Sequence, residues 1–285
     1  MECPQKEKQG KFKNAKTVAY NLLAAFIYYD QKRLMVILRM SIAELLSTFM
    51  FVMLGCASTM ATLWWDFYHT PHTQVAMGFA FAYIAALEFG GRISGAHLNP
   101  CVTLAACILG KKAWAELPVY ALLQFIGASV GYEIVMAFAR PVDRYYMLEK
   151  GPPFCVPDIL PDISQSQAFS AEFWATFFYI LVLAGVWDSR VRDKIDAVSL
   201  KLGFTYLALH LAFGDLTGCY MNPMISVAVI MIGGVKPGGF FAVFFIAPVI
   251  ATIVAATIYR LAFALPYHME MENWGLPVRK PPTSK

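Results

Sequence analysis

Two asparagine-proline pairs occur in matching sequence contexts. Ser94–Val102 reads SGAHLNPCV, Thr217–Ile225 reads TGCYMNPMI, and a short apolar stretch follows each of them. Asparagine is a preferred helix N-cap, and proline fits the first helical position because an N–H there would have no intrahelical partner. Each pair therefore predicts the start of a helix. The side-chain amides of Asn99 and Asn222 supply N–H donors that can bind and orient a small polar solute.

Two glutamates stand at matching places before these pairs. Glu44 lies in the apolar sequence AELLSTFMF and Glu172 lies in AEFWATFFY. An ionisable residue inside such a segment can serve a proton relay. The matched positions favour a different role, in which each buried carboxylate accepts backbone N–H groups and holds a neighbouring loop in shape. We expect His97, Pro100 and Pro223 to complete this loop scaffold, His97 as a hydrogen-bond partner and the prolines as fixed helix starts.

The elements that position these residues must lie in a membrane. The chain has 285 residues, of which 58% are hydrophobic and 15% charged, and its mean hydropathy is +0.54. This composition is too apolar for a water-facing surface, so a water-soluble enzyme is excluded and no catalytic residue is expected. The net charge of +4 is modest, and Lys and Arg lie mostly between the apolar runs, which argues against nucleic-acid binding.

The spacing of cysteine and histidine predicts neither a metal site nor a cofactor. No paired-Cys or Cys/His spacing typical of zinc occurs, and His97 has no second ligand at helical spacing. The cysteines are scattered along the chain. We therefore interpret all six as free thiols: Cys3, Cys56, Cys101, Cys107, Cys155 and Cys219.

Six apolar stretches are long enough to cross a bilayer, which needs about 20 residues per helix. The segments after the two Asn-Pro pairs, Cys101–Leu109 and Met224–Ile232, are about half that length and cannot span alone. A further apolar patch, Thr17–Tyr29, suits either a helix in the membrane interface or a poorly ordered leader. The expected spans lie near 37–60, 75–89, 113–138, 168–187, 198–213 and 239–265.

The two halves of the chain repeat the same features in the same order. Three spans per half is an odd number, so the second half must cross the membrane in the opposite sense. The two short helices then enter from opposite faces, and their starts meet near the bilayer midplane. The expected organisation is an N-terminal segment at 1–36, a first repeat at 37–138, a connecting loop at 139–167, an inverted second repeat at 168–265 and a tail at 266–285.

The distribution of basic residues predicts the orientation. Of the 23 Lys and Arg residues, nineteen fall on the side that holds both termini and the remaining four on the other side. Cytoplasmic loops carry this excess, so we expect both termini in the cytoplasm and the connecting loop outside. The C-terminal residues contain no retention signal, which favours the plasma membrane.

From about Arg39 to Leu265 the sequence resembles the aquaporin, or major intrinsic protein, family, whose signature is two Asn-Pro-Ala boxes in inverted repeats. The segment SGAHLNP followed by VTLA is highly specific, and LTGCYMNP is recognisable, although the boxes here read NPC and NPM. The resemblance implies an all-α membrane protein with six transmembrane helices and two re-entrant half-helices. It also implies one pore in each protomer of a homotetramer within the lipid bilayer.

The resemblance further implies an outer selectivity filter, placed by counting from the two asparagines. The first three filter positions resemble those of water-selective members. The fourth, where the family carries Arg, is isoleucine, which removes a fixed cation and frees space. Bulky aromatic groups favour water, whereas an aliphatic wall suits glycerol or urea, so both interpretations stay open. The filter residues are Phe79, His210, Cys219 and Ile225.

Three functions remain open at this stage. The first is a passive channel for water, with small neutral solutes as further candidates, which excludes ions and protons because two helix starts each place about half a positive charge at the midplane. The second is a non-conducting junctional or scaffold protein with a degenerate pore, suggested by Ile225, Met224 and Tyr220. The third is a proton-coupled transporter that uses Glu44 and Glu172.

Overall fold

The computed structural model describes residues 34–60, 72–139, 155–188, 190, 197–234 and 239–264. The interfacial helix expected at Thr17–Tyr29, the tail at 266–285 and Cys3 lie outside the described residues. The chain forms two compact units, Met1–Ile42 and Ala43–Lys285, and every tertiary contact discussed below belongs to the second unit.

All regular secondary structure in the described residues is helical. The first helix spans Leu34–Ala57. The last span is continuous and passes through two π-helical segments, η2 (Ala242–Ile246) and η3 (Tyr259–Phe263), on either side of α9 (Ala247–Ile258). Between the first and last spans lie α2 (His72–Gly90), α3 (Pro100–Ile108), α4 (Glu116–Phe138), α6 (Gln165–Val186), α7 (Val198–Thr217) and α8 (Pro223–Gly233).

Five helices in the described part of the chain are long and apolar enough to cross a membrane: the first helix, α2, α4, α6 and Ala242–Phe263. The sixth span is α7, whose 20 residues reach about 30 Å, although Lys201 and Asp215 make it more polar. It extends past the end predicted at residue 213, because polar residues at a helix end can face water. With only 9 and 11 residues, α3 and α8 are too short to cross.

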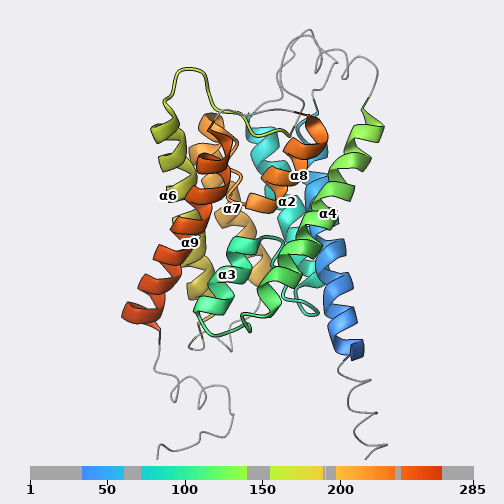
Figure 1. Ribbon diagram of the computed structural model, residues 1–285, viewed down its shortest axis with the longest axis vertical. Helices are drawn as coiled ribbons and strands as arrows, with labels where there is room; N and C mark the ends of the chain where they lie inside the picture. The colour runs from blue at the N-terminus through green and yellow to red at the C-terminus, as the bar shows by residue number, and fades with distance from the viewer. Residues whose placement is uncertain are drawn as a thin grey trace, which may run out of the picture. The chain divides into compact units, whose positions relative to one another are not determined.

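The two half-helices interlock the repeats. Figure 1 shows α3 and α8 between the longer helices, on opposite sides of the centre of this unit. Each half-helix packs against the last span of the other repeat, α3 against α9 and α8 against α4. The second helices of the two repeats, α2 and α7, also pack together. This exchange of contacts makes the inverted repeats one packed body.

Two glycines of α4 allow the first helix to come close. A Cβ added at Gly127 would lie 2.5 Å from the carbonyl oxygen of Leu45, and one added at Gly131 would lie 2.8 Å from that of Phe49. Both neighbours are backbone atoms and cannot rotate away. Small residues four apart let two membrane helices approach closely, so backbone packing fixes α4 against the first helix.

A disulfide joins Cys56 to Cys155, with their Cα atoms 5.1 Å apart. The expectation that all six cysteines are free thiols is therefore wrong for this pair. The two residues are 99 positions apart, so local spacing could not reveal that the fold brings the end of the first helix to the connecting loop. Of the other cysteines, Cys101, Cys107 and Cys219 are free and buried.

Candidate functional site

The loops that precede the half-helices adopt left-handed backbone at matching positions. This conformation costs about 1–3 kcal/mol for a residue other than glycine, so it persists only where neighbouring groups enforce it. In each loop the first of the three residues is glycine and the other two carry side chains. The residues with positive φ are Gly95, Ala96 and Leu98 in the first loop and Gly218, Cys219 and Met221 in the second.

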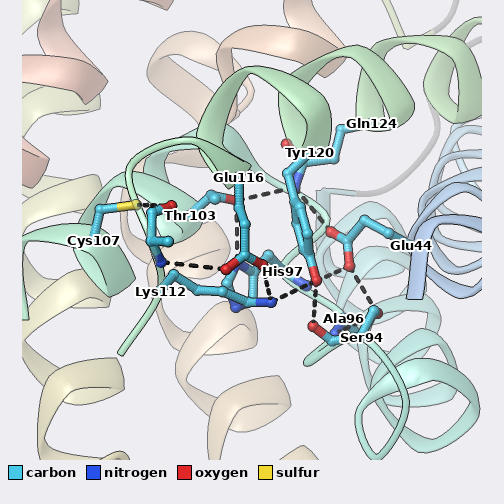
Figure 2. A network of polar contacts seen from close by, with 11 residues as sticks. Glu44, Ser94, Ala96, His97, Thr103, Cys107, Lys112, Glu116, Tyr120 and Gln124 are labelled. Atoms are coloured by element: carbon cyan, nitrogen blue, oxygen red, sulfur yellow. Dashed lines mark hydrogen bonds and ion pairs between the residues drawn. The ribbon is translucent and has the colours of Figure 1, made fainter. Parts of the chain in front are cut away.

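The carboxylate of Glu44 holds the first loop. Its Oε2 accepts hydrogen bonds from the His97 backbone nitrogen at 3.1 Å and from the Ser94 hydroxyl at 2.8 Å. Its Oε1 accepts from the Leu98 backbone nitrogen at 2.7 Å and from the Gln124 amide at 2.8 Å. Figure 2 shows Glu44 between Ser94 and Gln124. Four donors therefore converge on one fully buried carboxylate.

Glu172 holds the second loop in the same way. Its Oε1 accepts from the Thr217 hydroxyl at 2.7 Å and from the Tyr220 backbone nitrogen at 2.9 Å. Its Oε2 accepts from the backbone nitrogen of Met221 at 2.8 Å. Thr217 also accepts a hydrogen bond from the Cys219 backbone nitrogen at 3.3 Å. The two carboxylates thus satisfy equivalent backbone donors in the two repeats, and this fixes the direction of the neighbouring carbonyl groups.

The two asparagines cap the half-helices. The side-chain oxygen of Asn99 accepts from the backbone nitrogen of Cys101 at 2.8 Å. That of Asn222 accepts from Met224 at 3.2 Å and from Ile225 at 3.4 Å. Both asparagines have extended backbone, and a proline occupies the start of each helix. This is the local geometry that the Asn-Pro pairs predict.

The amides of the same asparagines cross between the repeats. Asn99 Nδ2 donates to the carbonyl oxygen of Met221 at 2.7 Å, and Asn222 Nδ2 donates to that of Leu98 at 2.8 Å. The two half-helix starts therefore lie against each other's loop. Each start carries the positive end of a helix dipole, equivalent to about half an elementary charge, so two such ends meet at one place.

Matching positions of the two loops are braced by different neighbours. The ring of His97 lies 3.1 Å, through Nδ1, from the hydroxyl of Thr103 on α3. The equivalent residue, Tyr220, donates its hydroxyl to the carbonyl oxygen of Cys155 at 2.6 Å. Tyr220 therefore ties the second loop to the disulfide-bonded connecting loop. The sequence analysis names Tyr220 only as a residue that suggests a degenerate pore, and nothing in the sequence indicates this hydrogen-bond partner.

One cavity, which we call the outer cavity, has a volume of about 290 Å³ and is lined by three of the four expected filter residues, Phe79, His210 and Ile225. The rings of Phe79 and His210 stack with centroids 5.5 Å apart. Cys219 is fully buried and does not line this cavity. The connecting loop contributes Cys155 and its neighbours, so the disulfide stands at the cavity wall.

A second cavity, the inner cavity, has a volume of about 990 Å³, and charged residues of both signs line it. Lys112 Nζ lies 2.8 Å from Glu116 Oε2 and 2.8 Å from the Tyr120 hydroxyl (Figure 2). Partial burial lowers the pKa of Lys112, but these two contacts outweigh burial and raise it overall. Arg190, 2.6 Å from Asp188, holds the pKa of that carboxyl well below its usual range.

Asn99 and Asn222 line neither cavity, and the two cavities share no lining residue. The crossed asparagines are almost completely buried. Among the described residues, no group of three or more His, Cys, Asp or Glu side chains could hold a metal ion. The site therefore offers oriented amides, two helix starts and two cavities, which suit passage or recognition of a small polar molecule better than bond chemistry.

The family model for Major intrinsic protein matches residues 31–259, and the chain belongs to this family. It is a multi-pass membrane channel protein of that family and is not an enzyme. The predicted family and the predicted fold class are both confirmed.

Individual relatives are distant but cover most of the chain. Aquaporin-2 from Bos taurus is 28% identical over 222 residues, which is 78% of this chain and 78% of the relative. Aquaporin-9 from Homo sapiens is 26% identical over 239 residues, covering 79% of this chain and 81% of the relative. The X-ray structure of the aquaglyceroporin from Plasmodium falciparum aligns with a TM-score of 0.68 at 25% identity, over 79% of this chain and 96% of that chain.

Proposed function

We propose that the protein conducts water passively and excludes ions and protons, with glycerol and urea as candidate further permeants. The observation that carries this proposal is the crossed contact of Asn99 and Asn222 at the starts of the two half-helices. Each amide has two N–H groups, and the crossed contact uses one of them. The second N–H is the group that would donate to a passing water oxygen.

Ion exclusion follows from the same arrangement. Two helix starts at one point produce a positive field that opposes cations. A water molecule that accepts a hydrogen bond from an asparagine turns its own hydrogens away from it, which interrupts the chain of hydrogen bonds along which a proton would move. In this proposal Glu44 and Glu172 shape the loops and carry no proton, because each already accepts three or more hydrogen bonds.

Size selection is assigned to the outer cavity. Phe79 and His210 occupy space that the carbon skeleton of glycerol would need, which supports water as the main permeant. Ile225 offers neither charge nor donors there, and this supports passage of small neutral solutes. Cys219, the remaining expected filter residue, is fully buried and does not line this cavity, so this proposal assigns it no contact with the solute.

Osmotic shrinkage of proteoliposomes tests this proposal. Purified protein is reconstituted, and shrinkage in sucrose is followed by light scattering, with empty liposomes as the control. Faster shrinkage than in the control supports water conduction, and re-swelling in glycerol or urea identifies a further permeant. Shrinkage equal to the control, with folded and inserted protein, contradicts the proposal.

A second candidate function is a non-conducting junctional or scaffold protein. It is favoured by one observation, namely that the outer and inner cavities share no lining residue. Under this alternative the reconstituted protein would leave membranes no leakier than lipid alone. Close apposition of two membranes carrying the protein, measured by vesicle aggregation, would be its positive readout.

We further propose a homotetramer in the plasma membrane with both termini in the cytoplasm. The disulfide supports this orientation, because Cys56 lies at the end of the first helix away from the N-terminus and disulfides persist in oxidising compartments. Crosslinking in native membranes tests the tetramer. Protease protection of epitope tags at the two termini of the full chain, in intact cells, tests the orientation and the membrane together.

A further inference from the structure

A tyrosine that lines the outer cavity touches a tyrosine that lines the inner cavity. Tyr206 on α7 lines the outer cavity, and Tyr83 on α2 lines the inner cavity. Their rings stack with centroids 5.0 Å apart and planes inclined by 18°. Rings stacked at this separation are in contact and leave no room for a water molecule between their faces. Nothing of the size of a water molecule therefore fits between the two rings as they stand.

A third tyrosine completes the cluster. The hydroxyl of Tyr179 on α6 is hydrogen-bonded to that of Tyr83. Its ring packs edge-on against Tyr206, with centroids 6.0 Å apart. Phe51 backs the cluster with edge-on contacts to Tyr83 at 5.4 Å and to Tyr206 at 5.7 Å. All three tyrosine side chains are at least nine-tenths buried, so each is held by packing.

Helix periodicity places this cluster one helical turn away from the expected filter residues Phe79 and His210. Tyr83 lies one turn after Phe79 on α2, and Tyr206 lies one turn before His210 on α7. One turn before Tyr206 on α7 lies Leu202, which lines the inner cavity. The tyrosines thus occupy the layer between the two cavities on three separate helices.

We propose that Tyr83, Tyr179 and Tyr206 form the narrowest part of the pathway and set the upper size of what passes, in place of Phe79, His210 and Ile225. This inference rests on the proposed conducting function. Passage requires the stacked rings to move apart, and the bond from Tyr83 to Tyr179 holds one ring in place. The rings obstruct the pathway by their bulk, whereas the hydrogen bond between the hydroxyls keeps the Tyr83 ring in place.

Replacing the tyrosine rings with the smaller side chain of leucine tests the proposal. Tyr83→Leu, Tyr206→Leu and the double variant are reconstituted into proteoliposomes beside the wild-type protein, and water and glycerol permeability are measured per inserted protein. We expect a several-fold rise in water permeability in each single variant, and glycerol entry in the double variant. The single variants keep the test usable if the double variant fails to fold.

Two controls separate pathway effects from loosened packing. Tyr132→Leu removes the ring of a fully buried tyrosine on α4 that lines neither cavity, and it should leave permeability unchanged. Tyr83→Phe keeps the ring and removes only the hydroxyl, so it should leave glycerol excluded. Its water permeability should rise less than that of Tyr83→Leu.

Each combination of outcomes is informative. If the wild-type protein conducts and none of the tyrosine variants differs from it, the size limit lies elsewhere and the inference is overturned, while the conducting function stands. If the wild-type protein is silent and the leucine variants conduct, the cluster is the barrier and passive conduction by the resting protein is refuted. If folded variants and wild type are all silent, the cluster is not what closes the route, and both proposals fall.

Discussion

The Oε1 atom of Glu44 lies 2.7 Å from the backbone nitrogen of Leu98, a residue held in left-handed backbone at φ 60°. The same relationship joins Glu172 to Met221, which has φ 52°. A buried carboxylate thus compensates a strained residue in each repeat. The carbonyl groups of these two strained residues are the ones that accept the crossing asparagine amides.

Glu44→Gln should destabilise the protein, because the substituted amide would direct N–H groups at donors that now bind the carboxylate. An unsatisfied buried group costs about 1–3 kcal/mol, so the melting temperature in detergent should fall measurably. Glu172→Gln should behave in the same way. Glu133→Gln, at an exposed position on α4, is the matched control. Uptake driven by a pH gradient and lost in Glu44→Gln would instead favour the proton-coupled alternative.

Asn222→Asp should weaken both the crossed contact and ion exclusion. A carboxylate oxygen would replace the amide that donates to the Leu98 carbonyl, so two acceptors would face each other where a 2.8 Å hydrogen bond now stands. Its negative charge would also offset the positive field of the two helix starts. We expect lower water permeability and a cation leak, measured in the same proteoliposomes. Asn99→Asp should also lower water permeability and cause a cation leak. Unchanged water and ion flux in both variants would refute the proposed role of the two asparagines in conduction and ion exclusion.

Loss of the disulfide should lower stability. The double variant Cys56→Ser, Cys155→Ser releases a crosslink between residues 99 positions apart, and removal of a native disulfide typically costs about 2–5 kcal/mol. Thermal unfolding in detergent measures the effect, and wild-type protein treated with a reductant should shift in the same direction. Cys107→Ser removes a free thiol and should leave the transition unchanged. Equal melting temperatures for the double variant and the wild type would contradict this prediction.

Gly127→Ala should destabilise the contact between α4 and the first helix. The added Cβ would meet the Leu45 carbonyl oxygen at 2.5 Å, and overpacking of this kind costs about 1–3 kcal/mol. Gly185→Ala is the matched control, since a Cβ there meets nothing within 4 Å. In a helix it should be neutral or stabilise by about 0.5–1 kcal/mol. Gly127→Ala should therefore lower the melting temperature and Gly185→Ala should not, and a loss of similar size in both variants would contradict the close-packing explanation.

The sequence contained the information for the half-helices because their signals are local. Asn99 and Asn222 cap the helices that begin at the following prolines, and α3 and α8 begin where the Asn-Pro pairs predict. Cap chemistry and proline geometry act within one turn, so they can be interpreted without tertiary structure. The matched glutamates were conspicuous for a similar reason, since a carboxylate in an apolar run is rare.

The tyrosine cluster and the disulfide could not be predicted, because each depends on contacts between distant segments. Tyr83, Tyr179 and Tyr206 lie on three helices, and each reads as one aromatic residue among many in an apolar span. Nothing in their local sequence indicates that their rings meet. Counting from Asn222 names Cys219 as a filter residue but does not give the direction of its side chain. In the structure Cys219 is buried and does not line the outer cavity.

The crossed asparagine contacts constrain how the protein is made. During translation the first repeat enters the membrane before residues 217–223 have been synthesised, so Asn99 has no Met221 carbonyl to accept its amide. Until the second repeat is in place, the Asn99 amide therefore lacks this acceptor, although the local cap from its side-chain oxygen to Cys101 needs nothing from the second repeat. When Asn222 is synthesised, by contrast, the Leu98 carbonyl that accepts its amide is already part of the chain. The two halves are not separable modules, because the maturation of each one ends only when the other is in place.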